Sequence, residues 1–321
     1  MGDLNYKLPE YFGIKGVRAT KERGYFLCKT SDGFVKIHKT SNDPRDIIAL
    51  YELQKQLIAS GFSQTDLILE TPQGAPFLQL GRDIFIASRH IAGQELDLNN
   101  KNDIALALES LAKFHTAARG IWQKGAPAPS LAEAFMKQTS ALTQVIKQVN
   151  RRPRMSDFDM LLIKNAQFYS DLANTALHAL NQTNYAALHA NALESGHICH
   201  NVIKEESLPI FQETCYILNL SEATINLQLA DLESFIRRYA RRSNQAIPIG
   251  QLVELYNKFA PLPSTAIYIL HAQLSYPWLF MKLVSQYYSK KRNFTPIAIE
   301  SRMTEILEVQ ENYTRYINEL I

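Results

Sequence analysis

The sequence lacks the features of a disulfide-stabilised protein, of a fibrous protein and of a strongly basic nucleic-acid-binding protein. Only three of its 321 residues are cysteine, at positions 28, 199 and 215. An odd number without a CxxC pair argues against disulfides and favours a reducing compartment. The 13 glycines and 13 prolines follow no period, which excludes collagen-like and low-complexity chains. The formal net charge of +3 is too small to predict a nucleic-acid partner.

Long hydrophobic runs are also missing. The most apolar stretch, residues 266–284, is interrupted by His271, Gln273, Pro277 and Lys282. It therefore predicts a buried helix pair broken near Pro277 and no membrane span. No basic segment followed by an apolar one opens the chain, which predicts no secretory signal. The remaining composition, 46% hydrophobic and 20% charged residues, is that of a globular protein long enough for two lobes.

The first ninety residues predict a small sheet that carries one helix. Apolar runs bounded by turn residues place strands at 24–30, 33–39, 66–74, 75–81 and 82–91. Ser31 and Asp32, followed by Gly33, predict a hairpin between the first two strands. An amphipathic segment follows the second strand, with Pro44 in its first turn and Gly61 as its C-terminal cap.

From about residue 100 the apolar pattern becomes helical. Helices are expected at 103–120, 131–150, 156–183 and from residue 229 onward. A short irregular island with strand character, residues 196–220, lies among them. The prediction is an α+β fold with a small antiparallel sheet lobe, residues 1–90, and a larger helical lobe, residues 91–321. This plan is similar to the two-lobed fold of protein kinases and their small-molecule relatives.

Lys36 and Glu52 are the candidate pair for binding nucleotide phosphates in such a fold. Kinases hold phosphate oxygens with a lysine on the strand before the lobe's helix, and a glutamate on that helix orients the lysine. Lys36 lies in the strand 33–39, and Glu52 is the only glutamate of the following helix. A lysine on a solvent-facing strand position would show the same pattern. No glycine-rich loop precedes Lys36, because residues 17–26 offer only Gly24.

The island and several segments around it resemble the CotS family of spore coat proteins, kinase-like chains related to aminoglycoside phosphotransferases and choline kinases. The resemblance is carried mainly by CHNVIKEESL (199–208) and CYILNLSEATINLQLADLESFIRR (215–238). Weaker likenesses are GYFLCKTSDGFVKIHK, FIASRHIAGQELDL, LAKFHTAARG and YPWLFMKLVSQYYSKKR. Together they span nearly the whole chain and imply the two-lobed kinase-like fold.

The resemblance also implies that the polar groups of the reaction are missing. Active relatives carry His-x-Asp-x4-Asn in this loop and a further aspartate in a later strand. His200 matches the histidine, but the catalytic aspartate falls on Val202, the metal-binding asparagine on Ser207 and the metal-binding aspartate on Asn219. Base assistance is worth about 10²–10⁴ in rate, and Mg²⁺ usually relies on carboxylates. We therefore expect no catalytic residue and no metal site.

Three other interpretations of the island stay open. Glu205 or Glu206 could replace the missing aspartate if the backbone loops inward, although KEES is typical of a solvated turn. His189, His197, Cys199, His200 and Cys215 could supply a zinc site, but their spacings match no zinc motif. Cys199 and His200 could form a nucleophile pair, but neighbours on an extended segment point to opposite faces.

Residues on two later helical segments favour structure over chemistry. His115 is expected to be a buried, hydrogen-bonded core residue, and Asp231 is expected to brace the helical lobe or to begin its helix as an N-terminal acid. The same helix carries two i,i+4 pairs of arginines, Arg237, Arg238, Arg241 and Arg242. Such a run is typical of a solvated face, and it could also bind an acidic partner or a phosphate.

The expected function is that of a catalytically inactive kinase-like protein, a pseudokinase with a structural or assembly role in sporulation. The resemblance implies synthesis in the mother-cell cytoplasm, later association with the spore coat, and other coat proteins as partners. ATP could still bind through Lys36 and Glu52, without Mg²⁺. The alternative is an active ATP-dependent phosphotransferase that acts on a hydroxyl of a sugar or amino alcohol.

Overall fold

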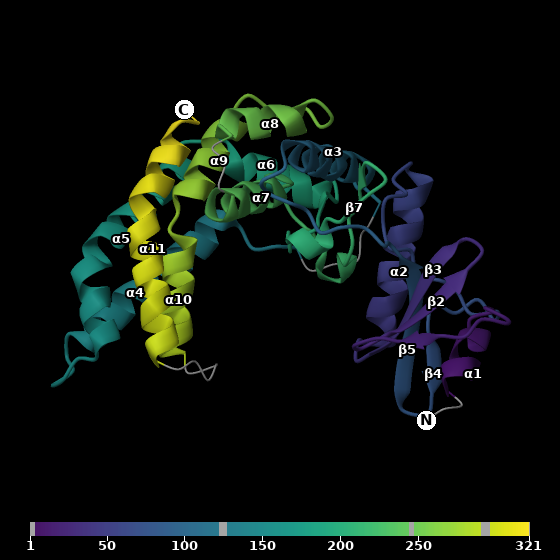
Figure 1. Ribbon diagram of the computed structural model, residues 1–321. Helices are drawn as coiled ribbons and strands as arrows, with labels where there is room; N and C mark the ends of the chain where they lie inside the picture. Colours follow the sequence, from purple (N-terminus) through teal and green to yellow (C-terminus); the bar gives the residue numbers. More distant parts are fainter. Residues whose placement is uncertain (1–3, 122–126, 244–246, 290–295, 321) are drawn as a thin grey trace. The chain divides into compact units, whose positions relative to one another are not determined.

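A computed structural model describes residues 4–121, 127–243, 247–289 and 296–320, and Figure 1 shows its helices and strands. The backbone gathers into two compact units, each built from separate segments. The first unit comprises Met1–Ala126, Ser195–Asp231 and Leu255–Ala260. The second comprises Pro127–Glu194, Leu232–Glu254 and Pro261–Ile321. The predicted lobe boundary near residue 90 falls inside the first unit and remains a prediction.

A five-stranded antiparallel sheet forms the N-terminal part of the first unit. Its strands are β1 (Thr20–Lys21), β2 (Phe26–Thr30), β3 (Gly33–Thr40), β4 (Leu78–Leu80) and β5 (Asp83–His90). They lie in the order β1-β2-β3-β5-β4. Lys36 of β3 is opposite Leu27 of β2 and Ser88 of β5. The predicted hairpin is confirmed, because Gly33 pairs with Thr30 across the turn between β2 and β3.

One face of the sheet is covered by the N-terminal helix α1 (Leu4–Tyr11). Leu8 of this helix and Phe12, which follows it, form one buried cluster with Val35 and Ile37 of β3. Successive side chains of a strand point to opposite faces. The residues that alternate with this buried pair therefore lie on the other face of the sheet.

The second face is covered by α2 (Pro44–Ala59), which begins at an Asp43 cap. Ile47 and Tyr51 of α2 pack against Ile86 of β5. His38 lies opposite Ile86, and alternation places Lys36 on the same face. This α2 face is therefore the one that presents Lys36.

The sheet differs from the prediction in the segment after α2. Residues 66–74 form no strand, and Ile68 makes only a single bridge to Ser88. The side chain of Gln54 explains this difference, because it donates to the Asp66 carbonyl at 2.8 Å and accepts the Ile68 N–H at 3.0 Å. Two backbone hydrogen bonds still join the segment to β5, from the Leu69 N–H to the Ala87 carbonyl at 2.8 Å and from the Arg89 N–H to the Leu67 carbonyl at 2.9 Å, so it forms a short bridge but not a longer strand. The strand expected at 75–81 is shortened to β4, and the sequence pattern did not predict α1 or β1.

The island returns to the first unit as short irregular pieces, as predicted. They are β6 (Ile198–Cys199), the 3₁₀ turn η1 (Glu205–Ser207), β7 (Ile210–Phe211), β8 (Thr214–Cys215), η2 (Leu220–Glu222) and β9 (Thr224–Ile225). β6 pairs with β9, and β7 pairs with β8. Ser110 of α3 (Lys101–Ala117) donates its hydroxyl to the Cys215 carbonyl at 2.8 Å. This bond attaches the island to α3.

Helices build the second unit. They are α4 (Leu131–Val149), α5 (Asp157–Asn181), α6 (Tyr185–Glu194), α7 (Leu229–Arg242), α8 (Ile249–Asn257), α9 (Ala266–Ser275), α10 (Trp278–Tyr288) and α11 (Pro296–Asn318). The start of α7 and the end of α8 belong to the first unit. The helix pair predicted around Pro277 is confirmed as α9 and α10, and α10 runs beside α11 (Figure 1). No helix among the described residues is both long enough and apolar enough to cross a bilayer.

Candidate functional site

A buried aspartate holds the turn at the centre of the island. Asp231, near the start of α7, is only 1% exposed. Its carboxylate accepts the backbone N–H of His200 at 2.5 Å and that of Asn201 at 2.8 Å. Asn201 has a φ of 71°, a left-handed conformation that asparagine tolerates better than most residues. The two bonds therefore fix the loop after β6 in one geometry.

His115 of α3 extends this contact into a buried chain of hydrogen bonds. Its Nε2 atom lies 2.9 Å from the Asp231 carboxylate, and its Nδ1 atom lies 2.7 Å from the Tyr256 hydroxyl. Burial disfavours the charged form of Asp231, but the hydrogen bond and charge of His115 and the loop N–H outweigh burial and lower the pKa of Asp231. We call these residues, His115, His200, Asn201, Asp231 and Tyr256, the loop frame. The predicted buried His115 is confirmed, and Asp231 braces the loop as well as its own helix.

Two residues of the loop frame, together with Cys199, form the one group of potential metal ligands found among the described residues. His115, Cys199 and Asp231 bring their ligand atoms within 4.8 Å of one another. These atoms already have protein partners, since His115 uses both ring nitrogens and Cys199 Sγ lies 3.6 Å from the Asn226 carbonyl. Burial raises the pKa of the Cys199 thiol well above its usual value, which opposes the thiolate that a metal needs. The group is a hydrogen-bonded core, and it is not the zinc set considered from the sequence.

The His200 ring is buried and bridges two segments of the island. Its Nε2 atom lies 2.7 Å from the Leu218 carbonyl, and its Nδ1 atom lies 3.3 Å from the Val202 N–H. The ring therefore carries its proton on Nε2 and accepts at Nδ1, as a neutral imidazole does. The side chain of Val202, two residues later in the loop, has no polar atom and is half-buried.

Ser207 and Asn219 lie on the two segments that His200 connects. The Ser207 hydroxyl accepts the Lys204 N–H at 3.0 Å and donates to the Lys204 carbonyl at 2.8 Å, so it is committed to the η1 turn. Asn219 precedes η2 in a left-handed conformation, φ 62° and ψ 48°, with an exposed side chain. The Leu218 N–H donates to the Ser207 carbonyl at 3.0 Å, which holds the segments together. Because Val202, Ser207 and Asn219 offer no carboxylate, this set does not fit Mg²⁺.

Glu206, an acidic residue of the η1 turn, does not change that conclusion. Glu206 is exposed and lies 3.5 Å from the ammonium of Lys204. The Glu205 carbonyl accepts the Leu208 N–H at 3.2 Å within the turn and the Leu96 N–H at 3.4 Å. Glu206 thus follows the solvated-turn interpretation of KEES.

The predicted pairing of Lys36 with Glu52 is not formed. Glu52 lies on the face of α2 opposite the buried Ile47 and Gln54, and its carboxylate is 3.9 Å from Lys55 Nζ. Lys36 is half-buried on the sheet, with Nζ 5.1 Å from the centroid of the Tyr25 ring. In the part of the chain that the structure describes, no ion pair within 4 Å joins Lys36 to Glu52. The phosphate-binding role of both residues stays a prediction.

Asp66 is the acidic group that the sequence reasoning missed. The Ile217 N–H donates to the Gln64 carbonyl at 2.8 Å, which brings the segment after α2 alongside Asn219. Burial raises the pKa of Asp66 to about 6, and the backbone N–H of Asn219, the Thr65 hydroxyl and the Lys36 charge act in the opposite direction. No spacing rule signals Asp66, because its surroundings depend on strand register and on a loop that folds back.

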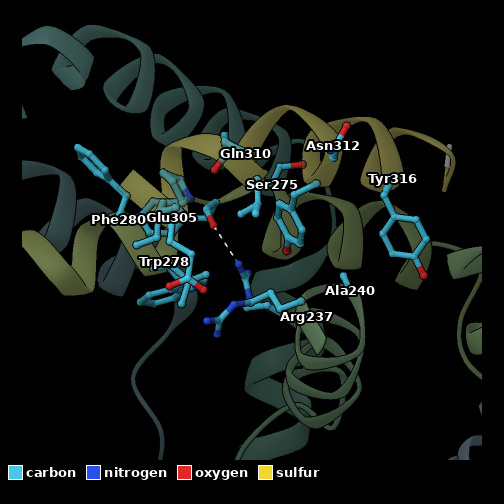
Figure 2. Close-up of a pocket in the computed structure, with 16 residues that line it drawn as sticks. Arg237, Ala240, Ser275, Trp278, Phe280, Glu305, Gln310, Asn312 and Tyr316 are labelled. Carbon is cyan, nitrogen blue, oxygen red and sulfur yellow. Dashed lines mark hydrogen bonds between the residues drawn. The ribbon is translucent and has the colours of Figure 1, made fainter. Parts of the chain in front are cut away.

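The arginine cluster of α7 is divided between interior and surface. The Arg237 side chain is 12% exposed, pairs with Glu233 one turn earlier and donates to the Gln273 carbonyl at 2.7 Å. Figure 2 shows Arg237 in the lining of a pocket of about 240 Å³, together with Trp278, Glu305 and Tyr316. Since the Arg237 donors are occupied by protein groups, Arg237 does not join the solvated anion-binding face considered from the sequence.

These features define a kinase-like fold: an antiparallel sheet that carries a lysine beside one helix, and a histidine loop braced by a later aspartate. A family model described as "Spore coat putative kinase YutH" matches residues 5–320. The chain belongs to this family of kinase-like spore coat proteins, and the resemblance to such proteins drawn from the sequence is confirmed. A comparison with curated protein sequences found no match.

Three solved structures illustrate the fold that this chain shares. An aminoglycoside phosphotransferase from Alicyclobacillus acidocaldarius is 16% identical, with a TM-score of 0.82 over 94% of this chain and 91% of that chain. The AMP-bound spectinomycin phosphotransferase APH(9)-Ia is 13% identical, with a TM-score of 0.68 over 99% and 97%. A choline/ethanolamine kinase family protein from Mesorhizobium loti is 13% identical, with a TM-score of 0.55 over 99% and 97%. They establish the predicted α+β kinase-like fold.

Proposed function

We propose that this protein is a pseudokinase of the spore coat, a kinase-like chain that transfers no phosphate and acts in coat structure or assembly. One observation carries the proposal. The loop frame around His200 and Asp231 is fully hydrogen-bonded, while Val202, Ser207 and Asn219 place no base and no carboxylate on it. The hydrogen-bonded loop that would hold the catalytic groups is present, but these three positions do not carry those groups.

Each replacement removes a different contribution to catalysis. Val202 has no atom that accepts a proton from a substrate hydroxyl, and such base assistance is worth about 10²–10⁴ in rate, or roughly 3–5 kcal/mol of barrier. The Ser207 hydroxyl is already used inside η1. Asn219 is uncharged, so the phosphate charge would lack the metal that normally neutralises it. Losing all three together supports an inactive protein.

Nucleotide binding, on this proposal, is weak and independent of metal. Lys36 is a cation that a phosphate could contact, but Glu52 does not orient it in this structure. Residues 17–26 also lack the glycines of a phosphate-covering loop. Both observations support a protein that works through its surfaces and not through turnover.

The proposed location follows from family membership. The protein is made in the mother-cell cytoplasm and becomes associated with the spore coat, where other coat proteins are its partners. A fluorescent fusion followed through sporulation would test this location, with the fluorescent protein alone as the control. Signal that stays evenly spread in the mother cell after coat formation would contradict it.

A transfer assay tests the absence of activity. The protein would be incubated with γ-labelled ATP, Mg²⁺ and a panel of sugars and amino alcohols, beside the Lys36→Ala variant. The proposal predicts the same background label in both. Turnover by the natural protein that Lys36→Ala abolishes would instead establish the alternative, an active small-molecule phosphotransferase.

A further inference from the structure

The face of the sheet that presents Lys36 also carries an acidic segment from outside the sheet. In the ladder, Lys36 is opposite Ser88, and Ser88 is bridged to Ile68. Opposite residues of antiparallel strands share a face, and so do residues two apart. Asp66, two residues before Ile68, is therefore brought to the same side of the sheet as Lys36.

The segment that carries Asp66 is fixed from two directions. Gln54, a buried residue of α2, bonds to the Asp66 carbonyl at 2.8 Å and to the Ile68 N–H at 3.0 Å. On the other side, Ile217 N–H donates to the Gln64 carbonyl at 2.8 Å. The carboxyl group is thus held at a defined place between the sheet and the segment that leads to Asn219.

The surroundings of Lys36 offer few other anionic groups. Its ammonium lies 5.1 Å from the Tyr25 ring centroid, an interaction that orients a cation without neutralising it. His38 and His90, whose pKa values are lowered by burial and also by the Lys36 charge, add no negative charge. The carboxylate of Glu52 lies 3.9 Å from Lys55 Nζ instead.

Among the described residues no ion pair within 4 Å joins Lys36 to Glu52 or to Asp66. We infer that Asp66, and not Glu52, is the charge that acts on Lys36 over a longer distance across this face of the sheet, and that it positions this lysine beside the loop that ends at Asn219. The inference rests on the proposed function only where it gives Lys36 a role in contacting nucleotide phosphates. Asp66 is a positioning residue in this scheme. Its negative charge offsets the field of Lys36, so phosphates without a metal meet a nearly neutral site.

A double-mutant cycle tests the pairing without any nucleotide. Unfolding would be measured in denaturant for the natural protein, Lys36→Met, Asp66→Asn and the double variant, with Glu52→Gln replacing Asp66→Asn in a matched control cycle. We expect the Lys36 and Asp66 changes to be coupled by at least about fivefold in the unfolding equilibrium constant. The control cycle should be additive within about twofold. Coupling to Glu52 but not to Asp66 would overturn the inference.

A second measurement covers the case in which Asp66→Asn does not fold. Lys36→Met leaves Asp66 without its partner, whereas Lys36→Arg keeps the charge. We expect Lys36→Met to raise the unfolding equilibrium constant at least about fivefold more than Lys36→Arg does. Equal losses in the two variants would contradict a charge role for Lys36.

Anion binding supplies a readout that a purely structural role of Asp66 would not move. Inorganic tripolyphosphate, titrated without metal, should bind Asp66→Asn several-fold more tightly than the natural protein, because the opposing charge is gone. Adding Lys36→Met to the Asp66→Asn variant should remove that gain in tripolyphosphate affinity. Unchanged or weaker binding by a folded Asp66→Asn would overturn the inference. Turnover in the transfer assay would refute the proposed function and leave the coupling test unaffected.

Discussion

The Nε2 atom of His115 and a carboxylate oxygen of Asp231 lie 2.9 Å apart, with both side chains 1% exposed or less. The same carboxylate accepts the N–H groups of His200 and Asn201, so one buried charge connects α3, the loop after β6 and the start of α7. None of these bonds involves Val202. The loop therefore keeps its geometry whether or not a catalytic carboxylate stands on it.

Removal of the Asp231 carboxylate should be strongly destabilising. Asp231→Ala leaves two backbone N–H groups, one of them buried, and a buried histidine without their acceptor, and we expect a loss of about 3–5 kcal/mol in unfolding free energy. The exposed Asp32 of the β2–β3 turn is the matched control, where Asp32→Ala should cost less than about 1 kcal/mol. Denaturant unfolding measures both. Similar losses of unfolding free energy in the two variants would contradict a stabilising role of the loop frame.

Acid should remove the same contribution. The pKa of Asp231 is lower in the folded protein than in the unfolded chain, where an aspartate titrates at about 3.9. The folded state thus binds fewer protons, and its advantage is complete above about pH 5 and declines as the pH falls through 3.9 toward the folded pKa. The stability difference between the natural protein and Asp231→Asn should narrow from pH 6 to pH 3. A stability difference between the two proteins that grows as the pH falls would contradict this prediction.

The three cysteines should be unreactive while the chain is folded. Burial raises the pKa of Cys28 to about 11 and that of Cys215 to about 12, and it raises the pKa of Cys199 well above the usual range. The thiolate is the reactive form, so labelling at pH 8 should be at least about 100-fold slower than in denaturant. Mass spectrometry counts the labels. Rapid modification of any of the three in the native protein would show that its site is open.

Arg237 should matter more for stability than its neighbour Arg241. Arg237→Ala leaves Glu233 partly buried without a partner, a loss of about 3–5 kcal/mol for an uncompensated ion. Arg241 is exposed, so Arg241→Ala should cost less than about 1 kcal/mol. Thermal and denaturant unfolding of the two variants compare them directly. If both changes were equally mild, the ion pair inside α7 would not be structural.

The sequence was informative where a local pattern determined the structure. Ser31, Asp32 and Gly33 predicted the hairpin between β2 and β3, and Pro277 marked the break between α9 and α10. The resemblance to kinase-like spore coat proteins implied that Val202 and Ser207 replace reactive residues, and both lie with His200 on one hydrogen-bonded loop. Short-range rules suffice when the determining contacts are a few residues apart.

The errors arose where a long-range contact decided the outcome. The segment 66–74 is predicted to be a strand, but it forms only a bridge at Ile68, where the side chain of Gln54 binds the Asp66 carbonyl and the Ile68 N–H. The order of elements predicts that Glu52 pairs with Lys36, but the buried face of α2 turns Glu52 outward and the pair is not formed, while its phosphate-binding role stays a prediction. Asp66 carried no signal, because its neighbours Lys36 and Asn219 are 30 and 153 residues away in the chain.

Calorimetric titration of ATP with and without Mg²⁺ tests most directly whether the site lacks a metal anchor. Asn219→Asp, which restores a carboxylate at one position, is the matched variant. We predict that Mg²⁺ changes the ATP affinity of the natural protein by less than about twofold and tightens binding to Asn219→Asp by at least about fivefold. Tight, magnesium-dependent binding by the natural protein would contradict the pseudokinase assignment.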